Sequence, residues 1–500
     1  MVPLVVALAL LLAHFALEFS SALVLINYPF GADYGEGIVW QQMRNIMRGE
    51  GYAPLGVYPA IVYHYPPFFH VTTGLISRLL GTDELATGRA VSFVSTLATL
   101  PLLGLLAAWL GRRGRDPLAA VIGGAIVGLL FLSCAPVSEW SPFMRVDMIA
   151  LLFGMGGLAL ALRAIEKPRL LFLAALCFTL SVYSKQVSIA APAAAFVGLL
   201  VVRPRLAWAL AVITIVQSGI VLTILTGLTH GRFLQHIILY NVNRISPYGL
   251  SSLIAPIEQH ALYILLACSG AAVLTYRLIR LWRMRAEQPF AVAGIVAALV
   301  YFCLKTAMLA MIMKSGSSIN YVVEWLGAVA ILTGVLVVPA VETALDAFRG
   351  GWSAPGRGLA LPALVLAAVA FQAKLLPSID MTAADARFAR LKTEPLVALI
   401  RKTSRPVISD DMTLLIRAGR PVEWEPSIAA ELGATGRYDE KSFVRMVREH
   451  RFGLFITEGD RGDPVYDSRY NPAVAAAIEV FYPREYKIYR FTVHAPADRF

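Results

Sequence analysis

The stretch Asn27-Tyr28-Pro29-Phe30-Gly31-Ala32-Asp33-Tyr34-Gly35-Glu36-Gly37 directly follows an apolar segment, residues 3–26, that is long enough to cross a membrane. It opens a loop that continues to about Thr82. Two carboxylates at the start of so long a loop are more typical of a membrane enzyme than of a channel. The sequence therefore predicts a membrane protein whose first loop takes part in chemistry.

Composition divides the chain into two parts. Of the 500 residues, 57% are hydrophobic and 15% are charged, whereas soluble domains carry about 25% charged residues. The 125 residues from Leu376 onward hold 19 of the 44 basic and 18 of the 33 acidic side chains, which is an ordinary soluble density. The sequence predicts a transmembrane module over residues 1–376 and an extracytoplasmic α/β domain over residues 377–500.

The membrane module is predicted to be a polytopic α-helical protein with about eleven spans. The fifth and sixth spans are short and could instead form a re-entrant pair. The first loop, residues 27–82, is predicted to hold two interfacial helices at about 38–48 and 68–80. The predicted spans are residues 3–26, 88–110, 117–134, 146–163, 170–184, 187–202, 206–228, 258–278, 289–312, 322–341 and 358–376.

Basic residues predict the orientation of these spans, because Lys and Arg are enriched in cytoplasmic loops. Fourteen of them follow the even-numbered spans. This places the N-terminus in the cytoplasm and the C-terminal domain in the periplasm or outside the cell. It also accounts for most of the net charge of +11, so no nucleic-acid partner is predicted. The fourteen are Arg112, Arg113, Arg115, Arg163, Lys167, Arg169, Arg203, Arg205, Arg277, Arg280, Arg283, Arg285, Arg349 and Arg357.

The C-terminal part reads as a small α/β domain. Residues 406–409 and 452–457 are apolar runs typical of buried strands, and residues 486–493 alternate as one last strand. Short helices are expected at 413–418 and 439–450.

Asp33 and Glu36 are the candidate catalytic residues. A carboxylate near the membrane surface suits a general base that deprotonates an acceptor hydroxyl, since burial can tune its pKa. The second carboxylate could shape the site or, if a divalent metal takes part, hold it together with Asp33. Because both acids precede the helix expected from Ile38, solvated loop acids or helix caps are the competing interpretation.

Polar residues at the outer ends of later spans form a second candidate group. Ionisable side chains at membrane depth are costly and usually mark a site, and basic ones suit a lipid phosphate. Lys185 stands out, because it has no acidic neighbour in sequence. Structural ion pairs, such as Arg145 with Asp147 or Lys314 with Glu324, are the alternative. The predicted substrate-binding residues are Tyr34, His64, Tyr65, Arg145, Lys185, Gln186, Asn243, Arg244, Lys314, Asn320, Tyr321 and Glu324.

The order of these pieces resembles the C-type (GT-C) membrane glycosyltransferases, close to the protein-mannosyltransferase and aminoarabinose-transferase branch, glycosyltransferase family 39. The resemblance covers most of the membrane part. The matching pieces are Gly31-Ala32-Asp33-Tyr34-Gly35-Glu36, Tyr65-Pro66-Pro67, Arg145-Val146-Asp147, Tyr183-Ser184-Lys185-Gln186 and Gly316-Ser317-Ser318-Ile319-Asn320-Tyr321-Val322-Val323-Glu324.

The resemblance implies an inverting transfer from a polyprenyl- or dolichyl-phosphate sugar, with Asp33 at the catalytic position. The acceptor would be a hydroxyl of a lipid, glycan or protein. Some members of the family carry two adjacent acids in this loop, whereas Asp33 and Glu36 are separated by Tyr34-Gly35. No cofactor is implied with certainty, since the superfamily varies in its use of metal.

Two other classes of protein compete with this interpretation. A transporter or flippase of lipid-linked sugars would also have eleven or twelve spans, but such proteins often show repeated halves, and none is visible here. A non-catalytic scaffold or a polymer ligase is the third possibility. Convergence of Asp33 and Lys185 on one cavity would favour transfer, because one phosphosugar must touch both.

Overall fold

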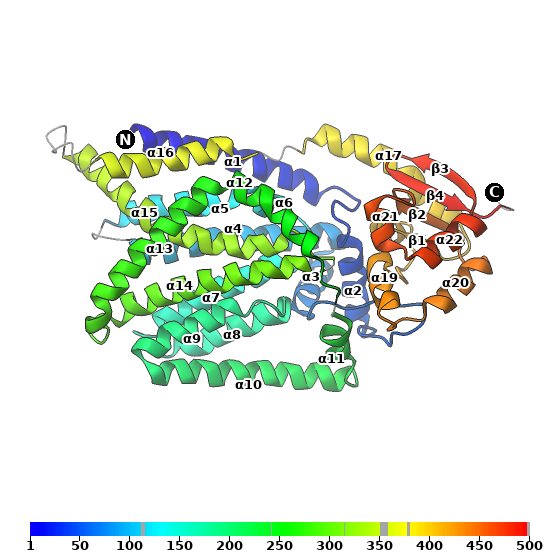
Figure 1. The fold of residues 1–500 in the computed structure, drawn as a ribbon, viewed down its shortest axis with the longest axis horizontal. Coiled ribbons are helices and arrows are strands. Elements are labelled where there is room, and N and C mark those ends of the chain that lie inside the picture. The colour runs from blue at the N-terminus through cyan, green and yellow to red at the C-terminus, as the bar shows by residue number, and fades with distance from the viewer. Residues whose placement is uncertain (112–115, 242, 315, 351–358, 378–380, 498–500) are drawn as a thin grey trace.

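A computed structural model describes residues 1–111, 116–241, 243–314, 316–350, 359–377 and 381–497. Long helices lie side by side along the longest axis of the molecule, and a small domain that contains the sheet caps one end of this bundle (Figure 1). Of the basic residues used to predict the orientation, Arg112, Arg113, Arg115 and Arg357 lie outside the described residues.

Six helices of the described chain are long and apolar enough to cross a membrane, so the protein is an integral membrane protein. They are α1 (Val2–Ile26), α4 (Glu84–Gly111), α10 (Pro204–Leu228), α13 (Ala261–Leu281), α14 (Pro289–Met308) and α15 (Asn320–Arg349). Five shorter helices occupy the other predicted spans, namely α5 (Pro117–Leu132), α7 (Asp147–Arg163), α8 (Leu170–Ser184), α9 (Ala190–Val202) and α16 (Ala360–Leu375).

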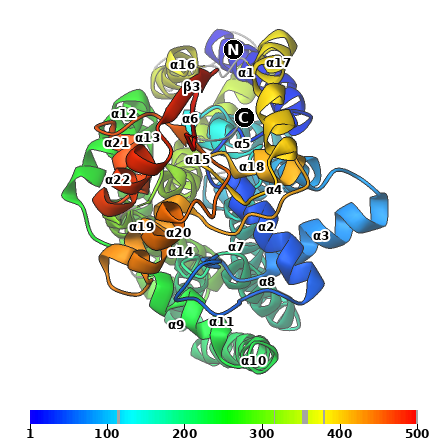
Figure 2. The same ribbon diagram turned by 90° about the vertical axis from the view of Figure 1, so that its right-hand side faces the viewer.

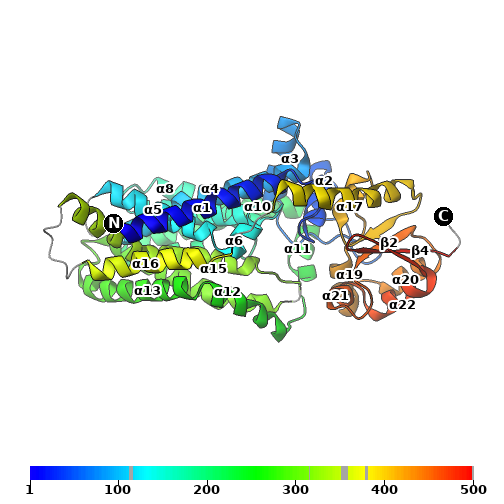
Figure 3. The ribbon, with the colours of Figure 1, turned by 90° about the horizontal axis from the view of Figure 1, so that it is seen from above.

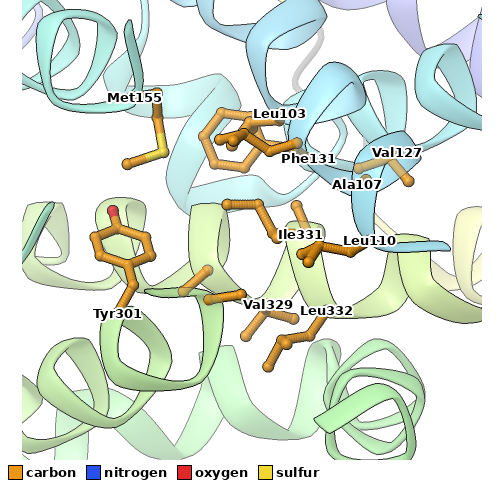
Figure 4. Packing of buried hydrophobic residues seen from close by; sticks show 14 of the residues in the cluster. Leu103, Ala107, Leu110, Val127, Phe131, Met155, Tyr301, Val329, Ile331 and Leu332 are labelled. Carbon is orange, nitrogen blue, oxygen red and sulfur yellow. The ribbon is translucent and has the colours of Figure 1, made fainter. Parts of the chain in front are cut away.

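The helix α15 is the centre of the bundle and packs against α4, α5, α13, α14 and α16. Leu103 of α4, Phe131 of α5 and Ile331 of α15 meet in its core (Figure 4). At the crossing of α4 and α5, a Cβ on Gly104 would lie 2.6 Å from the carbonyl oxygen of Gly124. Glycine is therefore required there for the close backbone approach that membrane helices use.

The first loop contains the two predicted helices, α2 (Glu36–Arg48) and α3 (Phe68–Leu80). The environment of α2 differs from the interfacial one predicted, because residues 36–43 are all buried and α2 packs against α3, α4 and α18 (Met412–Arg417). By contrast, α3 projects sideways from the body (Figure 3), and the side chains of Leu79 and Leu80 near its end are largely exposed.

The C-terminal domain contains a four-stranded sheet with the order β1-β2-β4-β3. The strands β1 (Val407–Ser409) and β2 (Leu454–Glu458) are parallel, and β3 (Arg484–Ile488) and β4 (Phe491–Ala495) form an antiparallel hairpin. The single last strand predicted over 486–493 was therefore wrong. Tyr489 turns the chain with a φ of 59°, and the tight turn lacks the Gly or Asn that would reveal it in the sequence.

Helices surround this sheet and face the viewer when the molecule is seen from its capped end (Figure 2). They are α17 (Ala383–Lys402), α18, α19 (Pro426–Ala434), α20 (Glu440–Arg448), α21 (Pro464–Arg469) and α22 (Pro472–Phe481).

Hydrogen bonds fix the C-terminal domain on the first loop. The backbone N–H of Gly31 donates to Thr413 Oγ1 at 2.8 Å, and Arg417 Nε donates to the carbonyl of Pro29 at 2.7 Å. The N–H of Ala60 donates to the carbonyl of Glu423 at 2.8 Å. The start of the loop is thus held between the helical bundle and the domain, where the candidate residues lie.

Candidate functional site

A cavity of about 360 Å³ lies between the end of the helical bundle and the C-terminal domain. Eleven of the fourteen candidate residues line it, and Glu36, Arg244 and Glu324 do not. The bundle also contributes Trp140, Asn241, Ser317 and Ser318, and the C-terminal domain contributes Glu425, Ser427, Ser468 and Arg469. The eleven are Asp33, Tyr34, His64, Tyr65, Arg145, Lys185, Gln186, Asn243, Lys314, Asn320 and Tyr321.

Asp33 lines this cavity, and only one of its two carboxylate oxygens is hydrogen-bonded to the described residues. Its Oδ2 accepts hydrogen bonds from the N–H of Gly35 at 2.9 Å and from Arg145 Nε at 2.7 Å, whereas Oδ1 accepts none from the described residues. A Cβ at residue 35 would overlap the Arg145 guanidinium, so glycine is needed there. Trp140 packs its ring on the same guanidinium at 5.3 Å from the centroid. Arg145 therefore orients Asp33, rather than forming the pair with Asp147 considered from the sequence.

Glu36 is fully buried and pairs with Arg89 of α4. Arg89 Nε donates to Oε1 at 2.7 Å and Nη2 donates to Oε2 at 2.6 Å. The backbone N–H of Met144 donates to Oε1 at 2.8 Å, and that of Ala32 donates to Oε2 at 2.9 Å. Burial by itself raises the pKa of Glu36, but Arg89 and the two N–H groups outweigh it and hold this pKa below the ordinary value.

Arg89 organises the start of the loop, because its five N–H groups are all used. Besides Glu36, they bind the carbonyls of Leu25, Tyr28 and Phe30 at 2.6 to 2.7 Å. The signal in the sequence was an arginine inside an apolar helix, which sequence reasoning missed. Both oxygens of Glu36 accept hydrogen bonds from protein donors. The described residues contain no group of three or more His, Cys, Asp or Glu side chains suited to a metal ion.

Lys185 lines the cavity but is not the unpaired cation that its sequence neighbours predicted. Its Nζ donates to Asp147 Oδ1 at 2.6 Å, and the ammonium lies 5.0 Å from the ring centroid of Tyr321. Asn320 and Trp140 also donate to Asp147, at 2.9 and 2.8 Å. The carboxylate that neutralises Lys185 comes from α7, 38 residues earlier, so the local sequence could not reveal it.

Among the cations that line the cavity, Lys314 has no carboxylate partner in the described residues. Its Nζ donates to the amide oxygen of Asn241 at 2.5 Å. The pair with Glu324 considered from the sequence does not form, because Glu324 binds Lys305 and accepts from Ser188 at 3.0 Å. The positive charge of Lys314 is therefore available to an anion in the cavity.

His64, Tyr65 and Gln186 form a neutral polar wall. The carbonyl of His64 accepts from Gln186 Nε2 at 2.8 Å, while the ring Nε2 of His64 and the Oε1 of Gln186 are buried without a protein partner. Burial, then the charge of Lys314, lowers the pKa of His64 to about 3. Burial raises the pKa of Tyr65 to about 12. Both rings are neutral at physiological pH and can offer hydrogen bonds to a ligand.

Arg244 lies outside the cavity and ties the bundle to the C-terminal domain. Its Nη2 forms an ion pair with Glu431 Oε1 of α19 at 3.1 Å. Its guanidinium is thus already paired with a carboxylate. Of the two cations, Lys314 is therefore the stronger candidate for binding a phosphate.

The wall from the C-terminal domain was not found in the sequence. Arg469 of α21 stacks on the Tyr34 ring at 4.1 Å from the centroid and pairs with Asp410 at 2.9 Å. The Tyr34 hydroxyl accepts from the N–H of Ser427 at 3.1 Å. Glu425 is 6% exposed, and its Oε2 has no hydrogen-bond partner in the part of the chain that the structure describes. The contacts that bring this domain to the cavity join residues almost 400 positions apart, which periodicity cannot predict.

Comparison with known proteins identifies the fold. No protein-family model matches the sequence, and no curated protein matches it by sequence. Among solved structures, ArnT from Cupriavidus metallidurans bound to undecaprenyl phosphate is similar over 98% of this chain and 97% of that chain, with 16% identity and a TM-score of 0.57.

The archaeal oligosaccharyltransferase AglB from Archaeoglobus fulgidus, in complex with an inhibitory peptide and a dolichol-phosphate, is similar over 97% of this chain and 74% of that chain. The identity is 12% and the TM-score 0.55. Both are membrane glycosyltransferases of the GT-C fold. The fold predicted from the sequence, a GT-C-like helical module followed by a C-terminal α/β domain, is confirmed.

Proposed function

We propose that this protein is an inverting glycosyltransferase that moves a sugar from a polyprenyl-phosphate donor to a hydroxyl of a lipid, glycan or protein acceptor. The observation that carries the proposal is one cavity lined both by Asp33, whose Oδ1 accepts no hydrogen bond from the described residues, and by Lys314. A base and an unmatched cation at the end of a membrane bundle are what a transfer from a lipid phosphate needs.

In the proposed reaction, the acceptor oxygen attacks the anomeric carbon while the bond from that carbon to the phosphate oxygen breaks. The hydroxyl proton passes to Asp33 Oδ1, and the bonding electron pair stays on the departing polyprenyl phosphate. Lys314 stabilises the charge that develops there. Lys185, which is neutralised by Asp147, supports the phosphate as a hydrogen-bond donor. A direct displacement of this kind inverts the anomeric carbon.

Two observations support the donor class. Undecaprenyl phosphate is bound in the ArnT structure and dolichol-phosphate in the AglB structure. The cavity lies at the end of the apolar bundle, so a prenyl chain can stay in the bilayer while its phosphate enters. We propose that the bundle lies in the plasma or inner membrane, with a cytoplasmic N-terminus and a periplasmic or extracellular C-terminal domain.

Asp33 and Lys185 line the same cavity. This convergence favours transfer over transport. Arg145 holds Asp33 by one oxygen and leaves the other to the cavity. A carrier that only moves a lipid-linked sugar has no need of a base fixed in this way.

A direct test adds the purified full-length protein to membranes from a strain that lacks its gene, which contain the unused donor and acceptor. Mass spectrometry of the lipid extract then follows free polyprenyl phosphate and the acceptor. We expect both free polyprenyl phosphate and a product heavier by one sugar unit. If the lipid-linked sugar pool stays intact, the proposal is wrong.

A further inference from the structure

The side chain of Glu425 lies on the cavity wall, and its Oε2 has no hydrogen-bond partner among the described residues. The residue is 6% exposed. Glu425 is the N-cap residue of α19, but its carboxylate does not cap that helix. The carboxyl of Glu425 is therefore not used by the helix that follows it.

Contacts hold the backbone on both sides of Glu425, and they fix the direction in which its side chain leaves the backbone. The Trp424 ring stacks on Phe443 with centroids 4.2 Å apart and planes 8° apart. Trp424 also forms a β-bridge with Ala60, whose N–H donates to the carbonyl of Glu423. After it, the N–H of Ser427 donates to the Tyr34 hydroxyl at 3.1 Å. A buried polar group without a partner costs free energy. A ligand that hydrogen-bonds to such a group, when its position is fixed, would recover this cost.

The position of Glu425 in the cavity indicates which part of a ligand it would meet. Lys185, Lys314 and Asn320 come from the bundle, where the proposed function places the phosphate of a lipid-linked ligand. Glu425 and its neighbour Ser427 come from the opposite wall, in the C-terminal domain. The group that reaches this wall is the part of the ligand farthest from the lipid chain, which in a lipid-linked sugar is the sugar itself.

We propose that Glu425 binds a sugar hydroxyl, so that the C-terminal domain selects the sugar while the bundle holds the phosphate. This inference rests on the proposed function and deepens it. Asp33 takes the proton that is transferred, and Glu425 acts as a specificity-determining partner. A neutral carboxyl can both accept from and donate to sugar hydroxyls, and a site built to hydrogen-bond a substrate hydroxyl strongly rejects analogues that lack it.

The protonation state of Glu425 gives the proposal a measurable signature. Burial raises the pKa of Glu425 to about 8, and the nearby Arg145 opposes this shift. The carboxyl is therefore neutral at pH 7 and can donate a hydrogen bond. The other titratable or charged groups that face the cavity are Asp33, Tyr34, His64, Tyr65, Arg145, Lys185, Lys314, Tyr321 and Arg469.

The test compares the full-length wild type with Glu425→Gln and Glu425→Ala, using membranes of the deletion strain as the source of donor and acceptor. Transfer of the sugar is followed from pH 6 to pH 9.5. Binding of undecaprenyl phosphate, which has no sugar, is measured separately by native mass spectrometry. Glu449→Gln is the matched control, because Glu449 is an exposed acid of the same domain.

We expect Glu425→Ala to lower kcat/KM at least tenfold with binding of undecaprenyl phosphate unchanged, and Glu425→Gln to recover most of the loss. Wild-type activity should fall above about pH 8, and Glu425→Gln should lack that fall. The proposal is overturned if Glu425→Ala transfers like the wild type, if Glu425→Ala weakens the binding of undecaprenyl phosphate as much as it weakens transfer of the sugar, or if Glu425→Gln keeps the alkaline fall. If the wild type transfers no sugar at all, the proposed function fails first and this inference with it.

Discussion

Asp33 and Glu36 lie on two different faces of the first loop, and their carboxylates have opposite environments. Asp33 faces the cavity, and Arg145 binds only its Oδ2, which leaves Oδ1 to a ligand. Glu36, three residues later, faces the bundle, where Arg89 and two backbone N–H groups occupy both of its oxygens. The comparison teaches that the partner arginine, and not the spacing of the acids, decides which carboxylate keeps an oxygen for a ligand and which one shapes the loop.

The largest effect is expected at the cavity face. Asp33→Asn removes the proton acceptor but keeps the size of the side chain and an oxygen for Arg145. We expect transfer to fall by about 10²–10⁴, the usual contribution of a general base. The measurement is kcat/KM on membranes of the deletion strain, and the amount of folded protein should match the wild type. Transfer within a factor of three of the wild type would contradict the role of Asp33.

On the bundle face, Glu36→Gln should act on stability. It leaves the guanidinium of Arg89 buried without its counter-charge, and breaking a buried pair usually costs about 3–5 kcal/mol. We therefore expect a fall of several degrees in the Tm of the purified protein in detergent. Glu50→Gln, a change at an exposed acid of the same loop, should leave Tm unchanged. An unchanged Tm in Glu36→Gln would mean that the loop does not depend on this pair.

The two lysines of the cavity extend the same comparison. Lys185→Ala leaves Asp147 buried without its ion pair. We therefore expect a clear fall in Tm and only a small change in the affinity for undecaprenyl phosphate. Asn320 and Trp140 would still donate to that carboxylate. A weaker affinity at unchanged Tm would show instead that Lys185 is mainly a ligand-binding residue.

Lys314→Ala should show the reverse pattern, because Lys314 has no carboxylate to leave unpaired among the described residues. We expect binding of undecaprenyl phosphate to weaken by about tenfold, which corresponds to about 1.4 kcal/mol, with Tm unchanged. Lys441→Ala, a change at an exposed lysine of the C-terminal domain, is the control. Equal affinity in the two variants would remove Lys314 from the phosphate site.

The smallest effect is a dependence of stability on pH at Glu425. Its pKa in the folded protein, about 8, lies above the ordinary value of 4.5. The unfolded chain therefore releases this proton more readily, and the wild type loses stability as pH rises from about 4.5 to about 8. Glu425→Gln lacks this loss, so its Tm should gain a few degrees on the wild type across that range. A difference in Tm that is constant with pH would contradict the buried, neutral carboxyl.

The sequence predicted the helices well and their partners poorly. Apolar runs of the right length are a local signal, which is why α1, α4, α10 and α15 lie close to the expected ranges. Ion pairs are not local. Arg89 is 53 residues from Glu36, and Arg145 is 112 residues from Asp33. Residue type alone could nominate Lys185 for the cavity, but it could not reveal that Asp147 neutralises it.

The C-terminal domain shows the same limit. Its strands β1 and β2 were predicted from apolar runs, but the hairpin of β3 and β4 was not, because Tyr489 takes the positive φ that glycine usually signals. Glu425 carries no sequence signal at all. Its proposed role rests on its burial at the cavity wall, which only the three-dimensional arrangement provides.

The most direct test of the two faces compares Asp33→Asn with Glu36→Gln in the deletion strain, by the masses of surface glycolipids and glycans and by the amount of protein in the membrane. We predict that the wild type restores a sugar unit that the deletion strain lacks. Asp33→Asn should restore none at a normal protein level, whereas Glu36→Gln should restore some in proportion to its lower protein level. Full restoration by Asp33→Asn would contradict the central claim that this carboxylate is the base.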